Sequence, residues 1–138
     1  MDERLRSLAA AINRWRARHI TEYWVEVSYI GSAVNRFGDH ELAFANGTLW
    51  HRWDGGWRAI EKGSDFWLFS VPGAFAWAHD ALTKLVPPEA GTDAVELEFD
   101  DEYGYVKLLR VRLPQRDVHN FTFEVRRFGV GPHPEFER

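Results

Sequence analysis

The chain has 138 residues, of which 45% are hydrophobic and 28% are charged, a composition typical of one folded domain. It contains no cysteine, which excludes disulfides, thiol nucleophiles, iron–sulfur clusters and cysteine-ligated zinc. The net charge of -4 opposes bulk electrostatic attraction to nucleic acid, so we expect no nucleic-acid partner.

The first residues predict a helix over about 3–18. Leu8, Ile12 and Trp15 recur at helical spacing on one face, and Asp2 is the expected N-cap. Charged residues open the chain, and no apolar stretch of about 18 residues follows, so we expect neither a signal peptide nor a membrane span. A cytoplasmic monomer or homodimer is the expectation, although a secreted form trimmed of its signal would read the same.

Alternating residues then predict strands over 23–30, 40–45 and 48–53, with a short fourth strand at 57–61. Asn46-Gly47 between two alternating runs is the strongest short hairpin signal, because a type I′ turn needs two positive φ angles. A two-residue loop fixes the register of the hairpin. The expected pairs are Phe44 with Leu49, Leu42 with His51, and His40 with Trp53.

A second helix is expected after Ser70, its N-cap, with Pro72 in the first turn and an end at Pro87-Pro88. Its inner stripe is expected to comprise Phe75, Ala78, His79, Leu82, Leu85 and Val86. Three more strands follow, at 95–99, 105–113 and 121–128, and we expect a flexible tail over 129–138.

These elements predict a single α+β domain over 1–138 with an ordered core of about 3–128. The expected architecture is one antiparallel sheet of six or seven strands with two helices packed on one face. The order is helix, three or four strands, helix, three strands.

Several segments resemble a known family. They are Trp15 with Tyr23, the hairpin around Asn46-Gly47, Ser70-Val71 with Phe75, the segment from Val95 through Asp100 to Tyr103-Gly104-Tyr105, and Asp117 with Phe123 and Phe128. Over roughly residues 12–128 the chain is similar to the bacterial family called domain of unknown function 6174, many of whose members look like secreted lipoproteins. The chain departs from it in lacking a cysteine pair in the loop after the first strand, and in having Asp101 and Val106 where members often have proline. The resemblance implies a fold and no activity.

Three polar groups are candidate sites. His40 and His51 lie diagonally on one hairpin face and could share a metal. No Asp, Glu or His nearby has a spacing that would make it a third ligand, and either ring could instead pack on Phe44 and Trp53. We therefore expect no metal and no cofactor. In His79-Asp80, His79 lies on the helical stripe, where a partly buried histidine bonded to a backbone carbonyl is the expectation. Asp100, Asp101 and Glu102 precede Tyr103-Gly104, a pattern typical of a turn. No catalytic motif is present.

The aromatic residues are the most unusual feature, since five of the seven tryptophans fall between residues 50 and 77. Trp50 points opposite to Trp53, so the hairpin cannot bury all of them in one core. Two interpretations stay open, a second packed cluster or a recognition surface. The binding residues predicted on this basis are Trp50, Arg52, Trp57 and Trp67.

The leading hypothesis is a non-catalytic domain that binds a small ligand or a protein through an aromatic-rich sheet face. The first alternative is a metal- or histidine-dependent enzyme using His40, His51 and a nearby carboxylate. The second is a structural or immunity-type partner of a larger protein.

Overall fold

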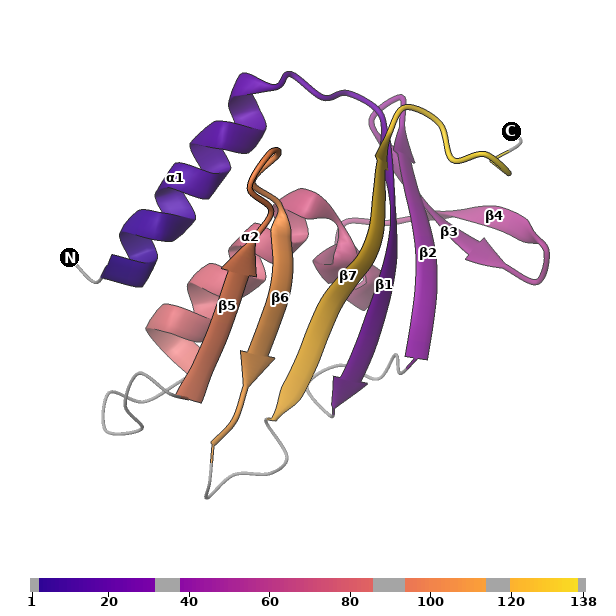
Figure 1. The fold of residues 1–138 in the computed structure, drawn as a ribbon. Coiled ribbons are helices and arrows are strands. Elements are labelled where there is room, and N and C mark those ends of the chain that lie inside the picture. Colours follow the sequence, from indigo (N-terminus) through magenta and orange to yellow (C-terminus); the bar gives the residue numbers. More distant parts are fainter. Residues whose placement is uncertain (1–2, 32–37, 86–93, 114–119, 137–138) are drawn as a thin grey trace.

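The computed structural model describes residues 3–31, 38–85, 94–113 and 120–136. Within these ranges seven strands form one antiparallel sheet in the order β4-β3-β2-β1-β7-β6-β5, shown in Figure 1. The strands are β1 (Tyr23–Gly31), β2 (Gly38–Ala45), β3 (Thr48–Trp53), β4 (Gly56–Ile60), β5 (Val95–Phe99), β6 (Val106–Val111) and β7 (Phe121–Val130). The helical elements are α1 (Glu3–Ala17), η1 (Asp65–Phe69), α2 (Val71–Asp80) and η2 (Ala81–Leu85). The predicted α+β class, single sheet and element order are confirmed.

The hairpin between β2 and β3 turns at Asn46 and Gly47, whose φ angles of 53° and 77° are those of the expected turn. The register pairs Phe44 with Leu49 and Leu42 with His51, as predicted. The third expected pair, His40 with Trp53, does not form: the β2–β3 pairing ends at Leu42 and His51, and Trp53 pairs only with Gly56 of β4 on its other side. The β3–β4 hairpin therefore leaves β2 beyond His51, and Figure 1 shows it splayed away from the rest of the sheet.

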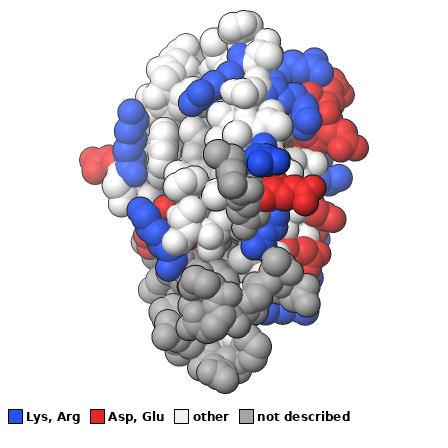
Figure 2. Space-filling view, turned by 90° about the vertical axis from the view of Figure 1, so that its left-hand side faces the viewer, with Lys and Arg blue, Asp and Glu red and all other residues white. Residues whose placement is uncertain are grey.

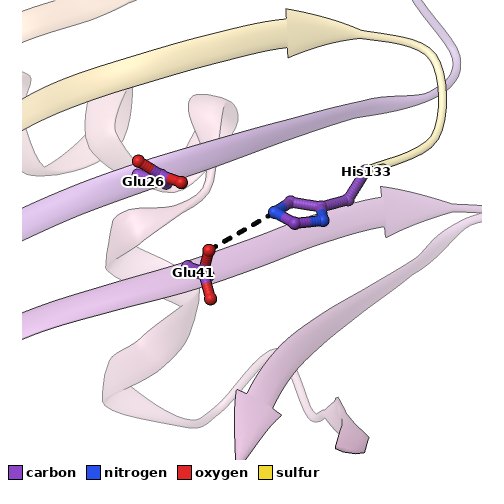
Figure 3. A group of neighbouring side chains, drawn as sticks. All are labelled: Glu26, Glu41 and His133. Atoms are coloured by element: carbon purple, nitrogen blue, oxygen red, sulfur yellow. Dashed lines mark ion pairs between the residues drawn. The ribbon is translucent and has the colours of Figure 1, made fainter. Parts of the chain in front are cut away.

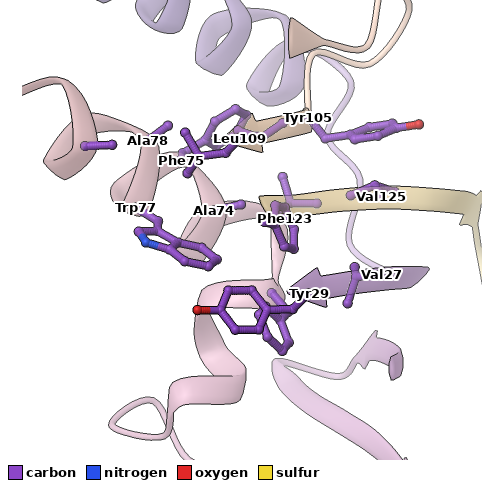
Figure 4. Packing of buried hydrophobic residues seen from close by; sticks show 14 of the residues in the cluster. Val27, Tyr29, Ala74, Phe75, Trp77, Ala78, Tyr105, Leu109, Phe123 and Val125 are labelled. Atoms are coloured by element: carbon purple, nitrogen blue, oxygen red, sulfur yellow. The ribbon is translucent and has the colours of Figure 1, made fainter. Parts of the chain in front are cut away.

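The main hydrophobic core lies between the helices and one face of the sheet (Figure 4). Tyr29 of β1 and Phe123 of β7 are fully buried there. Trp77 of α2 stacks on Phe121 with ring centroids 4.6 Å apart. Trp77, one of the clustered tryptophans, is therefore a core residue. Large aromatic rings supply much of the buried apolar area in this small domain.

Helix α2 begins as predicted. The Ser70 hydroxyl accepts a hydrogen bond from the Gly73 N–H at 3.0 Å, and Pro72 lies in the first turn, where a missing N–H costs nothing. The prediction for His79 is wrong, because its side chain is 57% exposed and lies 3.9 Å from Asp80. Ala74, Trp77 and Ala78 fill the arc of the helix that meets the core, which turns His79 outward. The expected helix end at Pro87-Pro88 lies outside the described residues.

The acidic segment before β6 is a turn, as predicted. The Asp100 carboxylate accepts hydrogen bonds from the backbone N–H groups of Glu102 and Tyr103, at 3.0 and 2.7 Å. Gly104 follows with a φ of 88° and lies against the carbonyl oxygen of Ala11 in α1. Helix α1 thus packs directly against this turn.

The described part of the chain has no helix with the length and apolar character needed to cross a membrane. On the face seen in Figure 2, basic and acidic side chains are interspersed among neutral ones. The described residues visible on that face therefore form no patch of a single charge sign.

Candidate functional site

The sheet face turned away from the helices carries an aromatic group on β1, β3 and β4. Trp50 and Arg52 alternate with the buried Leu49 and His51, so they point to the opposite side of β3. Arg52 lies opposite Trp57 of β4 in the register, and Trp24 of β1 lies on the same face. We call Trp24, Trp50, Arg52 and Trp57 the aromatic face. Three of the four predicted binding residues thus lie together.

Trp67, the fourth predicted residue, lies elsewhere. It belongs to η1 and packs, partly buried, against the main core on the helix side of the sheet. The Lys62 ammonium lies 5.9 Å from its ring centroid. The prediction for Trp67 is therefore not met on this face, because η1 packs on the helix side of the sheet although it is close in sequence to Trp50.

The aromatic face is covered by the chain's own residues 131–136, which we call the covering segment. Strand β7 continues to Val130, beyond the expected core boundary at 128, and Gly131 follows with a φ of 92°. The Gly131 N–H donates to the Glu22 carbonyl at 2.9 Å, which fixes the point where the chain leaves the sheet. From there the segment crosses above β1 and β2 toward β4, as the yellow trace in Figure 1 shows.

Two side chains of the covering segment make aromatic contacts. The His133 ring packs edge-on against Trp24 and Trp57, with centroids 5.0 and 5.2 Å away, and only 6% of this residue is exposed. Phe136 contacts Trp57 at 5.1 Å and Trp50 at 5.7 Å. Edge-to-face pairs at these distances are favourable beyond the area they bury. The aromatic face is thus a second packed cluster, covered by the six residues of the covering segment.

Polar contacts fix the position of the same segment. The Arg52 guanidinium binds the Glu41 carboxylate at 2.8 Å and the Glu135 carboxylate through its other nitrogen. These hydrogen bonds, the one to Glu135 foremost, raise the pKa of Arg52. The Trp57 indole N–H donates to the Glu135 carbonyl oxygen at 3.2 Å. Glu135 is therefore held at two points, its carboxylate by Arg52 and its backbone carbonyl by Trp57.

Beneath the covering segment, Glu26 and Glu41 lie directly opposite each other on β1 and β2 (Figure 3). Like charges in this position repel, and each carboxylate has a cationic neighbour, Arg127 for Glu26 and Arg52 for Glu41. His133 Nε2 lies 3.4 Å from Glu41, and one oxygen or nitrogen from each of the three residues could surround a metal ion.

The hydrogen bonding of His133 opposes a metal at this cluster. Its Nδ1 accepts the Glu135 N–H at 3.0 Å, so a neutral ring carries its proton on Nε2. A metal at this cluster would need the Nε2 lone pair, which that proton occupies. The group therefore acts as an anchor for the covering segment, with the His133 ring 3.4 Å from the Glu41 carboxylate.

His40 and His51 lie together on the opposite, helix-side face of the same hairpin. His40 Nδ1 and His51 Nε2 are 3.2 Å apart, so the predicted diagonal contact exists. Phe66 stacks on His51 at 4.1 Å, and Phe69 stacks on His40 at 5.5 Å, both from η1. The expected packing of these rings on Trp53 and Phe44 is thus largely taken over by η1.

A pocket of about 470 Å³ opens where β3 leaves β2. Both histidines line it, together with Asp39, Trp53 and Arg126. Trp53 is 60% exposed at its mouth, with the Arg58 guanidinium 4.7 Å above its ring. The pocket is a direct consequence of the pair that fails to form between His40 and Trp53.

No family model matches the chain, and no curated protein matches it either. The similarity to domain of unknown function 6174 therefore stays a prediction.

Sequence reasoning missed His133, Glu135 and Phe136. They belong to a short, proline-containing segment with no strand or helix periodicity, and their partners lie about 80 or more residues earlier in the chain, as for Trp57 and Glu135. The one local signal is indirect. Tryptophans of the hairpin point away from the main core, so another part of the chain is expected to cover them.

Proposed function

We propose that the chain is a non-catalytic protein-binding domain whose aromatic face recognises a short peptide segment with an acidic residue next to an aromatic one. The observation that carries this proposal is the seating of the covering segment. Its Glu135 and Phe136 engage Arg52, Trp57 and Trp50 through an ion pair, a backbone hydrogen bond and ring contacts. A partner with the same chemistry would find the same contacts.

The chemistry of the face selects a peptide over a small apolar ligand. The Trp57 indole N–H binds a main-chain carbonyl. Arg52 binds the Glu135 carboxylate with one nitrogen while the other is held by Glu41. Trp and Arg are also the residues that dominate binding energy at protein interfaces. In this proposal the covering segment occupies the face when no partner is present, and the partner's segment replaces it.

Tethering makes this competition severe for a free peptide, since a short linker gives the tethered segment an effective concentration in the millimolar range. The test therefore weakens the tethered segment first. In the double variant Glu135→Ala/Phe136→Ala the ion pair and the ring contacts are lost, while His133 stays in place.

A synthetic peptide with the sequence of residues 130–138 is titrated into this variant by calorimetry. We expect saturable one-to-one binding, at least about tenfold tighter than to the unaltered chain, because the tethered competitor is weakened. Adding Trp57→Ala should abolish binding, whereas Trp67→Phe on the other side of the sheet should leave it unchanged. A peptide with both the glutamate and the phenylalanine replaced by alanine is the ligand control. Absence of binding, or equal binding by the Trp57→Ala protein, would overturn the proposal.

A further inference from the structure

We infer that the His40–His51 pair is a binding site for a borderline divalent transition-metal ion such as Zn²⁺. The site lies on the helix side of the sheet and does not involve the covering segment. It stands or falls independently of the peptide-binding function.

The spacing of the two ring nitrogens carries this inference. Zinc binds imidazole nitrogen at about 2.0–2.1 Å, and two such nitrogens at a tetrahedral angle are about 3.3 Å apart. His40 Nδ1 and His51 Nε2 are 3.2 Å apart. The two rings therefore already hold the separation that a shared ion demands. The hydrogen bond between them is the metal-free form of the same arrangement, with a shared proton in place of the ion.

The rings are also held in place by their neighbours. Phe66 and Phe69 stack on His51 and His40 respectively, and His51 is only 2% exposed. A ligand pair whose rotamers are fixed by packing loses little conformational freedom on binding. Since η1 supplies both phenylalanines, one short element positions the whole pair.

The pocket supplies access and the remaining coordination positions. Both histidines line it, so an ion between them faces solvent on one side and completes its shell with water. Asp39 borders the pocket and adds negative charge. Two arginines border it as well, but Arg52 is paired with Glu41, and Arg126 lies 3.7 Å from Glu124. Two protein ligands and open positions describe an exchangeable site and not a structural one.

The test is equilibrium binding of ZnCl₂ to the full chain, with Co²⁺ as a spectroscopic substitute. We expect one Zn²⁺ per chain, a tetrahedral-type visible spectrum with Co²⁺, and no comparable binding of Mg²⁺, which prefers oxygen ligands. His40→Phe keeps the ring stacking on Phe69 and removes the ligand nitrogen. It should weaken Zn²⁺ binding by at least the roughly tenfold that loss of even an outer-shell partner costs.

His51→Phe is the second variant and should act in the same direction, with circular dichroism confirming the fold of both. His79→Ala removes an exposed histidine outside the site and should leave Zn²⁺ binding unchanged. His133→Ala separates this site from the Glu26, Glu41 and His133 group. Absence of stoichiometric Zn²⁺ binding, its retention in His40→Phe, or its loss in His133→Ala alone would each overturn the inference.

Discussion

Tyr23 illustrates how single polar atoms join the layers of this domain. Its ring lies in the core between Trp15 and Phe44, and its hydroxyl oxygen accepts the Val71 N–H at 3.0 Å. That N–H belongs to the first turn of α2, where backbone donors have no partner inside the helix. Burial raises the pKa of Tyr23, so the neutral phenol persists as the acceptor.

Replacing Tyr23 by phenylalanine should lower the free energy of unfolding by about 1–3 kcal/mol, because the buried Val71 N–H loses its acceptor. Urea unfolding followed by tryptophan fluorescence measures the change. Tyr103→Phe is the matched control, since no backbone donor of a helix depends on its hydroxyl in the described structure, and it should cost much less. Equal losses in the two variants would contradict this role of Tyr23.

Tyr105 gives the fold a dependence on alkaline pH. Burial and the nearby Asp100 raise its pKa from 10.0 to about 12. Between about pH 10 and 12 the unfolded chain therefore loses this proton while the folded chain keeps it, and stability falls as pH rises. Well below pH 10 Tyr105 is protonated in both the folded and the unfolded chain, and its full contribution to stability is present.

In Tyr105→Phe the decline of stability over this alkaline window should be shallower than in the unaltered chain. Tyr23 still contributes, so the slope does not vanish. Urea midpoints measured at several pH values above and below 10 give the two slopes. An unchanged slope would show that Tyr105 titrates alike in the folded and unfolded states.

At the scale of elements, α1 is attached to the sheet through the Asp100–Gly104 turn. The Gly104 N–H closes the turn on the Asp100 carbonyl at 3.0 Å, and a Cβ at this position would meet the Ala11 carbonyl oxygen of α1. Gly55, in the turn before β4, has a similar φ of 81° but open space around it. Substituting each glycine in turn therefore distinguishes the cost of backbone strain alone from the cost of strain plus a clash with α1.

Gly55→Ala should cost about 1–2 kcal/mol, the strain of a left-handed residue with a Cβ. Gly104→Ala should cost about 1–3 kcal/mol more, because α1 must also shift. Thermal or urea unfolding of both variants measures the difference. If the two variants lose the same stability, the contact between α1 and the Asp100–Gly104 turn does not stabilise the fold.

The predictable elements are those with local signals. The hairpin register follows from Asn46-Gly47, because two residues in the left-handed region leave the strands no alternative pairing. The start of α2 follows equally from Ser70 and Pro72. The position of His79 could not be predicted, since the short helix buries most of its surface and a stripe drawn at helical spacing does not say where its edge falls.

At the scale of the whole molecule, the sheet has two apolar layers. The helices cover one face, and the covering segment covers part of the other. Alternation along β3 revealed the second face in advance, but nothing local in 131–136 indicates its destination, because the decisive partners are long-range. The same holds for the pocket, which arises from two strands parting and not from any motif.

The most direct measurement of the central claim is ¹⁹F NMR of the Glu135→Ala/Phe136→Ala variant labelled with 5-fluorotryptophan. Each of the seven tryptophans then has its own resonance, assigned by single Trp→Phe substitutions. On titration with the peptide of residues 130–138, the resonances of Trp50 and Trp57 should shift saturably, while those of Trp67 and Trp77 stay fixed. Saturable shifts at Trp67 or Trp77 instead, or no saturable shift at all, would contradict a peptide-binding role for the aromatic face.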